Sequence, residues 1–156
     1  MRRVAAGLLV LSAAGGAFIA SHEGTRLAAY LDPVGLPTIC TGSTEGVRLG
    51  QVATFEECNA RLQRDTTHAG RAVAACTRVG ITQAQYDALV SLAFNIGQAA
   101  YCGSTLARKL NAGDCWGAGA EFPRWIYAKG RRLKGLERRR AEERVAFESG
   151  CDRGAA

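Results

Sequence analysis

Apolar residues recur at helical spacing in the middle of the chain and predict two central helices. In the first, positions near a 3.6-residue period are Phe55, Cys58, Leu62, Ala69 and Val73. This run follows the capping box Thr54-x-x-Glu57 and predicts a helix that ends at about Cys76. The second opens at the box Thr82-x-x-Gln85, and its apolar positions are Tyr86, Leu89, Val90, Ala93 and Phe94.

Between Arg26 and Cys40 the pattern changes to that of a β-hairpin. Residues 26–31 are mostly apolar, and the next four, Asp32-Pro33-Val34-Gly35, place Pro second and Gly fourth, as a type I turn prefers. Residues 36–40 can then run back as a second short strand. A hairpin of this form would bring Asp32 and Thr38 near each other, with Glu23 at its entrance.

The chain begins with an uncharged apolar run. After Arg2 and Arg3, residues 4–20 carry no charge and are rich in Gly and Ala. As a helix this run would reach about 26 Å, just short of a ~30 Å hydrocarbon core, and the Arg pair predicts a cytoplasmic N-terminus. Two interpretations stay open: a cleaved signal peptide with Gly15 and Ala17 near the cleavage site, or an uncleaved anchor that later leaves the bilayer.

Composition narrows the class of protein. A length of 156 residues with 47% hydrophobic residues fits one globular domain. The net charge of +6 suits an anionic partner, and bacterial cell walls are anionic. No zinc-finger spacing or aromatic-basic sheet signature accompanies that charge, so we expect no nucleic-acid partner.

Six scattered cysteines indicate an oxidising compartment. No Cys-x-x-Cys occurs, and His22 and His68 do not sit at metal spacing, so we expect neither a metal nor another cofactor. Six cysteines permit fifteen pairings. We expect the pairs Cys40–Cys58, Cys76–Cys102 and Cys115–Cys151, with free buried cysteines as the alternative.

Two carboxylates nine residues apart, Glu23 and Asp32, form the main candidate site, with the hydroxyl of Thr38 six residues further on. Cleavage of a glycosidic bond needs a carboxylic acid for the leaving oxygen and a carboxylate on the other side of the bond. Spacing alone favours a plainer interpretation, in which Glu23 ends a helix and Asp32 forms a turn.

The residues around this pair resemble those of the phage-type lysozymes, glycoside hydrolase family twenty-four. The motif is Glu23-Gly24-x-Arg26-Leu27-x-x-Tyr30-x-Asp32, then Gly35 and Thr38-Ile39. Similar matches are Ala88 to Gly97, Ser104 to Asp114, and Arg124-Trp125-x-Tyr127-Ala128-x-Gly130. The resemblance implies a mixed α+β, mostly helical fold of two lobes around a cleft, with Glu23, Asp32 and Thr38 as the catalytic triad. This chain departs from the family at Cys40 and Ser43, where Gly and His are usual.

The resemblance implies a peptidoglycan muramidase that acts as an endolysin in host lysis. The position of Glu23, three residues after the end of the apolar run, is similar to that in the signal-arrest-release endolysins of lambdoid phages. We therefore expect residues 1–20 to be a signal anchor and 21–156 the lysozyme domain, first in the host inner membrane and then, after release, in the periplasm as a monomer. Residues 1–39 contain no Cys, so control of release should be topological rather than redox.

The basic stretch from Lys129 to Arg140 carries seven Lys or Arg. Pairs at four-residue spacing, Arg138 with Glu142 and Arg139 with Glu143, favour a solvated helix face. The resemblance implies that one of residues 138–140 reaches Glu23, and we name Arg138 and Asn95 as candidate substrate-binding residues. Asn95 could equally be a plain helix C-cap.

Three rivals to the muramidase stay open from the sequence. A lytic transglycosylase would use one acid and no water. An inactive, membrane-anchored protein that binds the cell wall would need neither carboxylate for chemistry. A basic periplasmic structural protein would not act on the wall at all.

Overall fold

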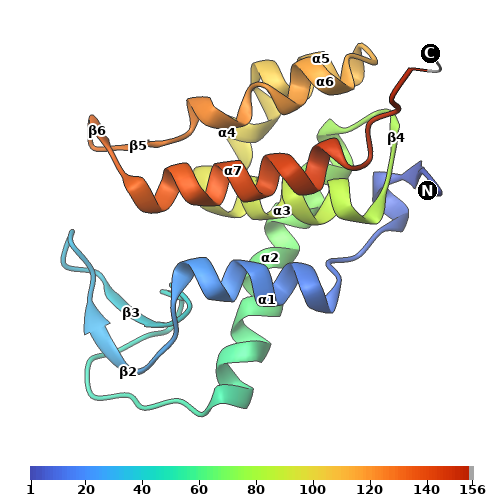
Figure 1. Ribbon diagram of the computed structural model, residues 1–156. Helices are drawn as coiled ribbons and strands as arrows, with labels where there is room; N and C mark the ends of the chain where they lie inside the picture. Colours follow the sequence, from blue (N-terminus) through green and yellow to red (C-terminus); the bar gives the residue numbers. More distant parts are fainter. Residues whose placement is uncertain (155–156) are drawn as a thin grey trace.

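The computed structural model describes residues 1–154, so the last two residues of the expected domain lie outside the described part. The molecule has two lobes joined by one long helix (Figure 1). The small lobe holds the antiparallel hairpin of β2 (Arg26–Leu31) and β3 (Pro37–Cys40), and the larger lobe is helical. Helix α2 (Phe55–Cys76) runs from the small lobe into the larger one. This confirms the predicted two-lobed, mostly helical α+β fold.

The two central helices begin where their capping boxes predict. Thr54 and Thr82 each accept a hydrogen bond from the backbone amide three residues on, and Glu57 and Gln85 bond back to the cap amides. Helix α3 (Gln83–Ile96) is the centre of the core, packed against both α2 and α7 (Lys134–Glu148). Burial on several sides leaves Leu89, Val90 and Leu92 with no exposed surface.

Between α3 and α7 the chain forms short elements that cover the helical lobe. These are α4 (Gln98–Cys102), α5 (Thr105–Asn111), α6 (Cys115–Gly119), the 3-10 helix η2 (Phe122–Arg124), β5 (Tyr127–Ala128) and β6 (Arg131–Arg132). Strands β5 and β6 form a tight hairpin whose turn, Lys129 and Gly130, has φ of 51° and 75°. The basic stretch is therefore a hairpin followed by a helix, not one continuous helix face.

The apolar N-terminal run is folded against the rest of the molecule. It forms β1 (Val4–Ala5), the 3-10 helix η1 (Ala6–Leu8) and, after a break, α1 (Ala13–Glu23). Strand β1 pairs with β4 (Gly80–Ile81), and α1 packs mainly on α3 with Ile19 fully buried. Within residues 1–154, no helix has both the length and the apolar character needed to cross a bilayer.

Three disulfides tie distant parts of the fold together, and they are the three pairs expected from the sequence. Cys40–Cys58 joins β3 to α2, Cys76–Cys102 joins α2 to α4, and Cys115–Cys151 joins α6 to the segment after α7. Cys40 has φ of 60°, a left-handed conformation that normally favours glycine, which is the residue usual at this position in the family that the sequence resembles.

Candidate active site

Glu23 is the last residue of α1 and faces an open pocket. Gly24, with φ of 71°, ends the helix and turns the chain into β2. The Glu23 side chain keeps 23% of its surface exposed, and Arg139 Nη1 donates a hydrogen bond to its Oε1 at 2.5 Å. The carboxyl is thus held on one side by a buried cation and is open to solvent on the other.

The pocket beside Glu23 has a volume of about 370 Å³ and lies between the two lobes. Its walls come from the end of α1, the loop after β3, α2 and the end of α3; the lining residues are Glu23, Thr41, Gly42, Thr44, Glu45, Asp65, Phe94 and Asn95. Carboxylates, hydroxyls and an amide on these walls suit a polar, hydroxyl-rich ligand. In the described part of the chain, no group of carboxylates, histidines or cysteines is arranged to hold a metal ion.

Asp32 and Thr38 lie together at the end of the β2–β3 hairpin. Thr38 is opposite Tyr30, and Asp32 follows β2 directly. Asp32 Oδ1 accepts hydrogen bonds from the amides of Val34 and Leu36, both at 2.9 Å, which closes the turn. The hydroxyl of Thr38 donates to the Leu36 carbonyl at 2.9 Å. Neither residue lines the Glu23 pocket, so their joint action with Glu23 stays a prediction.

Asn95 and the arginines differ from the sequence expectations in detail. The guanidinium that reaches Glu23 is that of Arg139, whereas Arg138 is exposed. Asn95 lines the pocket, and the C-cap of α3 is Gly97 instead. Asn95 Oδ1 accepts a hydrogen bond from Arg140 Nη1 at 2.8 Å, which fixes the amide at the pocket wall.

The burial of the charged residues on α7 was not found from the sequence. The solvated face expected around Arg139 and Glu143 is wrong, because Arg139, Arg140 and Glu143 are all buried under the pocket. The resemblance had already implied that one of residues 138–140 reaches Glu23, and that residue is Arg139.

Two polar contacts brace the pocket from outside. Ser43, which stands where the resembled family usually has His, donates its hydroxyl proton to Asp65 Oδ2 on α2 at 2.5 Å. His22, next to Glu23, lies 2.9 Å from Glu142 on α7 and packs against the Phe18 ring. The first contact joins the loop after β3 to α2, which both carry pocket residues, and the second joins the end of α1, next to Glu23, to α7.

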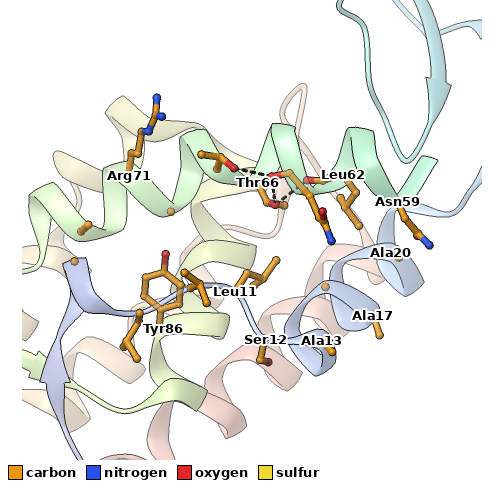
Figure 2. Close-up of a pocket in the computed structure, with 18 residues that line it drawn as sticks. Leu11, Ser12, Ala13, Ala17, Ala20, Asn59, Leu62, Thr66, Arg71 and Tyr86 are labelled. Carbon is orange, nitrogen blue, oxygen red and sulfur yellow. Dashed lines mark hydrogen bonds between the residues drawn. The ribbon is translucent and has the colours of Figure 1, made fainter. Parts of the chain in front are cut away.

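A larger cavity of about 740 Å³ lies between the N-terminal segment and α2 (Figure 2). Figure 2 shows its walls, with Ser12, Ala13, Ala17 and Ala20 on one side and Asn59, Leu62, Thr66 and Arg71 on the other. Arg71 is its only charged lining residue within the described chain, and burial raises the pKa of the Tyr86 phenol there. With no carboxylate on its walls this cavity cannot supply an acid, so the smaller Glu23 pocket is the candidate active site.

Comparisons with known proteins agree with this geometry. Residues 20–143 match the family model described as phage lysozyme. An endolysin from Acyrthosiphon pisum secondary endosymbiont phage 1 is 43% identical over 143 residues, 89% of this chain and 98% of that protein. A SAR-endolysin from Enterobacteria phage P21 is 40% identical over 123 residues, 78% of this chain and 74% of that protein.

Among solved structures, the muramidase domain of SpmX from Asticaccaulis excentricus is similar. Its TM-score is 0.84 at 36% identity, and the match covers 88% of this chain and 97% of that one. The family model spans most of the residues that form both lobes, including Glu23, the hairpin and α7 up to Glu143. This chain belongs to the phage lysozyme family.

Proposed function

We infer that this chain is a peptidoglycan muramidase that acts as an endolysin in host lysis. It would hydrolyse the β-1,4 bond between N-acetylmuramic acid and N-acetylglucosamine. The observation that carries the inference is a partly exposed carboxyl, Glu23, held by a buried arginine at the wall of an interlobe pocket, in a chain of the phage lysozyme family. Peptidoglycan is the expected partner, and the basic chain suits an anionic wall.

In the mechanism we propose, Glu23 donates its proton to the glycosidic oxygen as the bond to the anomeric carbon breaks. A water on the opposite ring face attacks that carbon, and Asp32 accepts the proton that the water loses. The Thr38 hydroxyl holds the same water. The position of Asp32 supports this role, because two backbone amides bind its Oδ1 and fix the carboxylate while leaving Oδ2 for water.

This arrangement predicts inversion at the anomeric carbon. An attacking water between the two carboxyls requires a separation of ~6.5–9.5 Å, against ~5–5.5 Å when the second carboxylate is a nucleophile. Asn95 and Arg138 would contact the glycan. The place of Asn95 on the pocket wall supports its role in binding, whereas only the exposure of Arg138 supports the role of that residue.

Product analysis in ¹⁸O-labelled water tests the reaction. We expect each cleavage to place one ¹⁸O at a new reducing end, first as the inverted α-anomer by NMR. A lytic transglycosylase would instead give anhydro-muramic ends without label. Label in the β-anomer would keep the hydrolase but overturn the role of Asp32.

We further propose that residues 1–20 are a signal anchor with a cytoplasmic N-terminus, which leaves the host inner membrane before the enzyme folds in the periplasm as a monomer. Two observations support this: residues 4–20 carry no charge, and the same run leads directly into Glu23 as part of the folded domain. While the run spans the bilayer, Glu23 lies at the membrane surface and cannot join the pocket. Sequencing the N-terminus of the periplasmic enzyme tests this; a start at Ala20 or Ser21 would rule it out.

A further inference from the structure

Glu143 is a fully buried carboxylate beneath the candidate active site. Its side chain has no exposed surface, and its Oε1 accepts hydrogen bonds from Ser91 Oγ at 2.6 Å, Arg140 Nη2 at 2.7 Å and Arg139 Nε at 3.2 Å. Its Oε2 lies 2.6 Å from Arg140 Nε in a buried ion pair. A buried ion with this many partners costs much free energy to desolvate, and two of the partners, Arg139 and Arg140, also bind residues that line the pocket.

The two arginines that Glu143 binds each use a second edge to hold a pocket residue. Arg139 Nη1 donates to Glu23 Oε1, and Arg140 Nη1 donates to Asn95 Oδ1. Both guanidiniums are almost fully buried, and burial lowers the pKa of Arg140 while the Glu143 carboxylate opposes that shift. Glu143 is therefore the shared ion-pair partner of the only two cations that reach these pocket residues in the described chain.

The balance of buried charges shows why Glu143 is needed to orient Arg139. Two buried cations face one buried anion, so one positive charge is left to be matched at Glu23. A flexible Arg139 could turn away from Glu23 toward solvent, because a guanidinium has five donors and several rotamers. The bonds from Glu143 and from the Ser91 hydroxyl and carbonyl fix its plane, so that only Nη1 faces Glu23.

We propose that Glu143 is a positioning residue for the reaction: it orients Arg139 so that Glu23 is held where it can protonate the glycosidic oxygen. The inference rests on the proposed function, since it assigns a second residue to the same acid. Glu143 touches neither the pocket nor the reacting atoms, so it acts only through the guanidiniums that it binds. Loss of its charge should misplace Glu23 through Arg139, and it also frees Arg140, which holds Asn95 at the pocket wall.

A positioning role and a purely structural role differ in kinetics. If Glu143 positions Glu23, Glu143→Gln lowers kcat by about 10-fold or more, because misplacement of an acid is felt in the transition state. A shift of Asn95 through Arg140 would instead appear as a higher KM. If Glu143 only stabilises the fold, the variant unfolds at lower temperature but the folded fraction keeps the kcat of the wild type.

The experiment measures kcat and KM on soluble peptidoglycan oligosaccharides, well below the unfolding temperature of each variant. Glu148→Gln is the matched control, because it removes the pair that Arg144 and Glu148 form further along α7, outside the pocket. We expect wild-type kcat in Glu148→Gln. In an Arg139→Gln background, Glu143→Gln should lower kcat less than about 2-fold further; a full loss of about 10-fold there would overturn action through Arg139.

A gentler variant keeps the test valid if Glu143→Gln does not fold. Ser91→Ala keeps every charge but removes the hydroxyl that binds both Glu143 and Arg139. We expect it to lower kcat at least about 3-fold at unchanged KM, and wild-type kcat would overturn the proposal. Glu23→Gln separates the two claims. If this variant stays active, the proposed function itself fails. If it is inactive while Glu143→Gln and Ser91→Ala keep the kcat of the wild type, only the positioning role of Glu143 is refuted.

Discussion

Asp32 is the residue at which the geometry of the hairpin and its proposed chemistry can be separated. An asparagine side chain at this position would still offer an oxygen to the amides of Val34 and Leu36 but would carry no charge. We expect Asp32→Asn to lower kcat by about 10²-fold or more while changing the unfolding free energy by less than ~0.5 kcal/mol. Steady-state kinetics and urea denaturation measure the two effects. A large loss of unfolding free energy that accounts for the loss of activity would mean that Asp32 is only a turn former.

Tyr101 gives the molecule a pH dependence that is distinct from catalysis. Burial raises the pKa of its phenol to about 12, and a hydrogen bond with Thr77 lowers it by less. The unfolded phenol ionises near pH 10, so its contribution to stability is full below that pH and is lost as pH rises toward 12.

We expect the unfolding free energy of the wild type to fall between pH 10 and 12 by up to ~1.4 kcal/mol per pH unit more steeply than that of Tyr101→Phe. Rapid urea titrations at several pH values compare the two proteins. Tyr86 is present in both, so its own raised pKa cancels in the difference. Parallel slopes would contradict this account of Tyr101.

At the scale of single elements, the docking of α1 depends on a close approach at one glycine. A Cβ on Gly15 would lie 2.7 Å from Asp87 Cγ, while a Cβ on Gly16 would have no neighbour closer than 3.9 Å. Asp87 cannot move freely, because it accepts hydrogen bonds from the amide and, very closely, from the hydroxyl of Ser12, the N-cap of α1.

The same substitution at these neighbouring positions should therefore have opposite effects. We expect Gly15→Ala to destabilise the fold by ~1–3 kcal/mol through overpacking and to reduce lytic activity, since α1 carries Glu23. Gly16→Ala should stabilise it by ~0.5–1 kcal/mol, because alanine favours a helix. Both variants change the apolarity of the N-terminal run equally. If thermal denaturation showed that both variants change the stability in the same direction, this account of how α1 packs on α3 would be wrong.

Elements with local signals were predictable, and those decided by tertiary contacts were not. The capping boxes at Thr54 and Thr82 fixed two helix starts, because the bonds involved span only three residues. The Asp32-Pro33-Val34-Gly35 turn fixed the hairpin for the same reason. The burial of Arg139 and Glu143 was missed. Four-residue spacing shows that two charges can pair, but it does not show which face of α7 is covered by α3.

Across the whole molecule, the N-terminal segment is part of the folded domain and links the start of the chain to its end. The uncharged run that we propose as a membrane anchor is split in the fold between a strand, a 3-10 helix and α1. Arg3, whose charge predicts the orientation in the membrane, donates to the Gly150 carbonyl at 2.7 Å and pairs with Asp152. The folded state therefore ties the first residues of the chain to the last elements.

The disulfides should contribute stability in the order of the loops that they close. Cys115–Cys151 closes 36 residues and Cys40–Cys58 closes 18, so a chain-entropy account gives ~4 and ~3 kcal/mol. We expect paired Cys→Ala variants to lose unfolding free energy in that order, as measured by urea denaturation with the other bridges intact. The reverse order would show that local packing of Cys40 outweighs loop closure.

The central claim is that Glu23 is the catalytic acid of a muramidase, and the most direct test is the clearing of purified peptidoglycan by Glu23→Gln. Glu56→Gln, which neutralises an exposed carboxylate in the first turn of α2, is the matched control. Circular dichroism first verifies that all three proteins are folded. We then expect wild type and Glu56→Gln to clear the suspension at the same rate and Glu23→Gln to be slower by at least ~10³-fold. Clearing by Glu23→Gln at the wild-type rate would contradict the account.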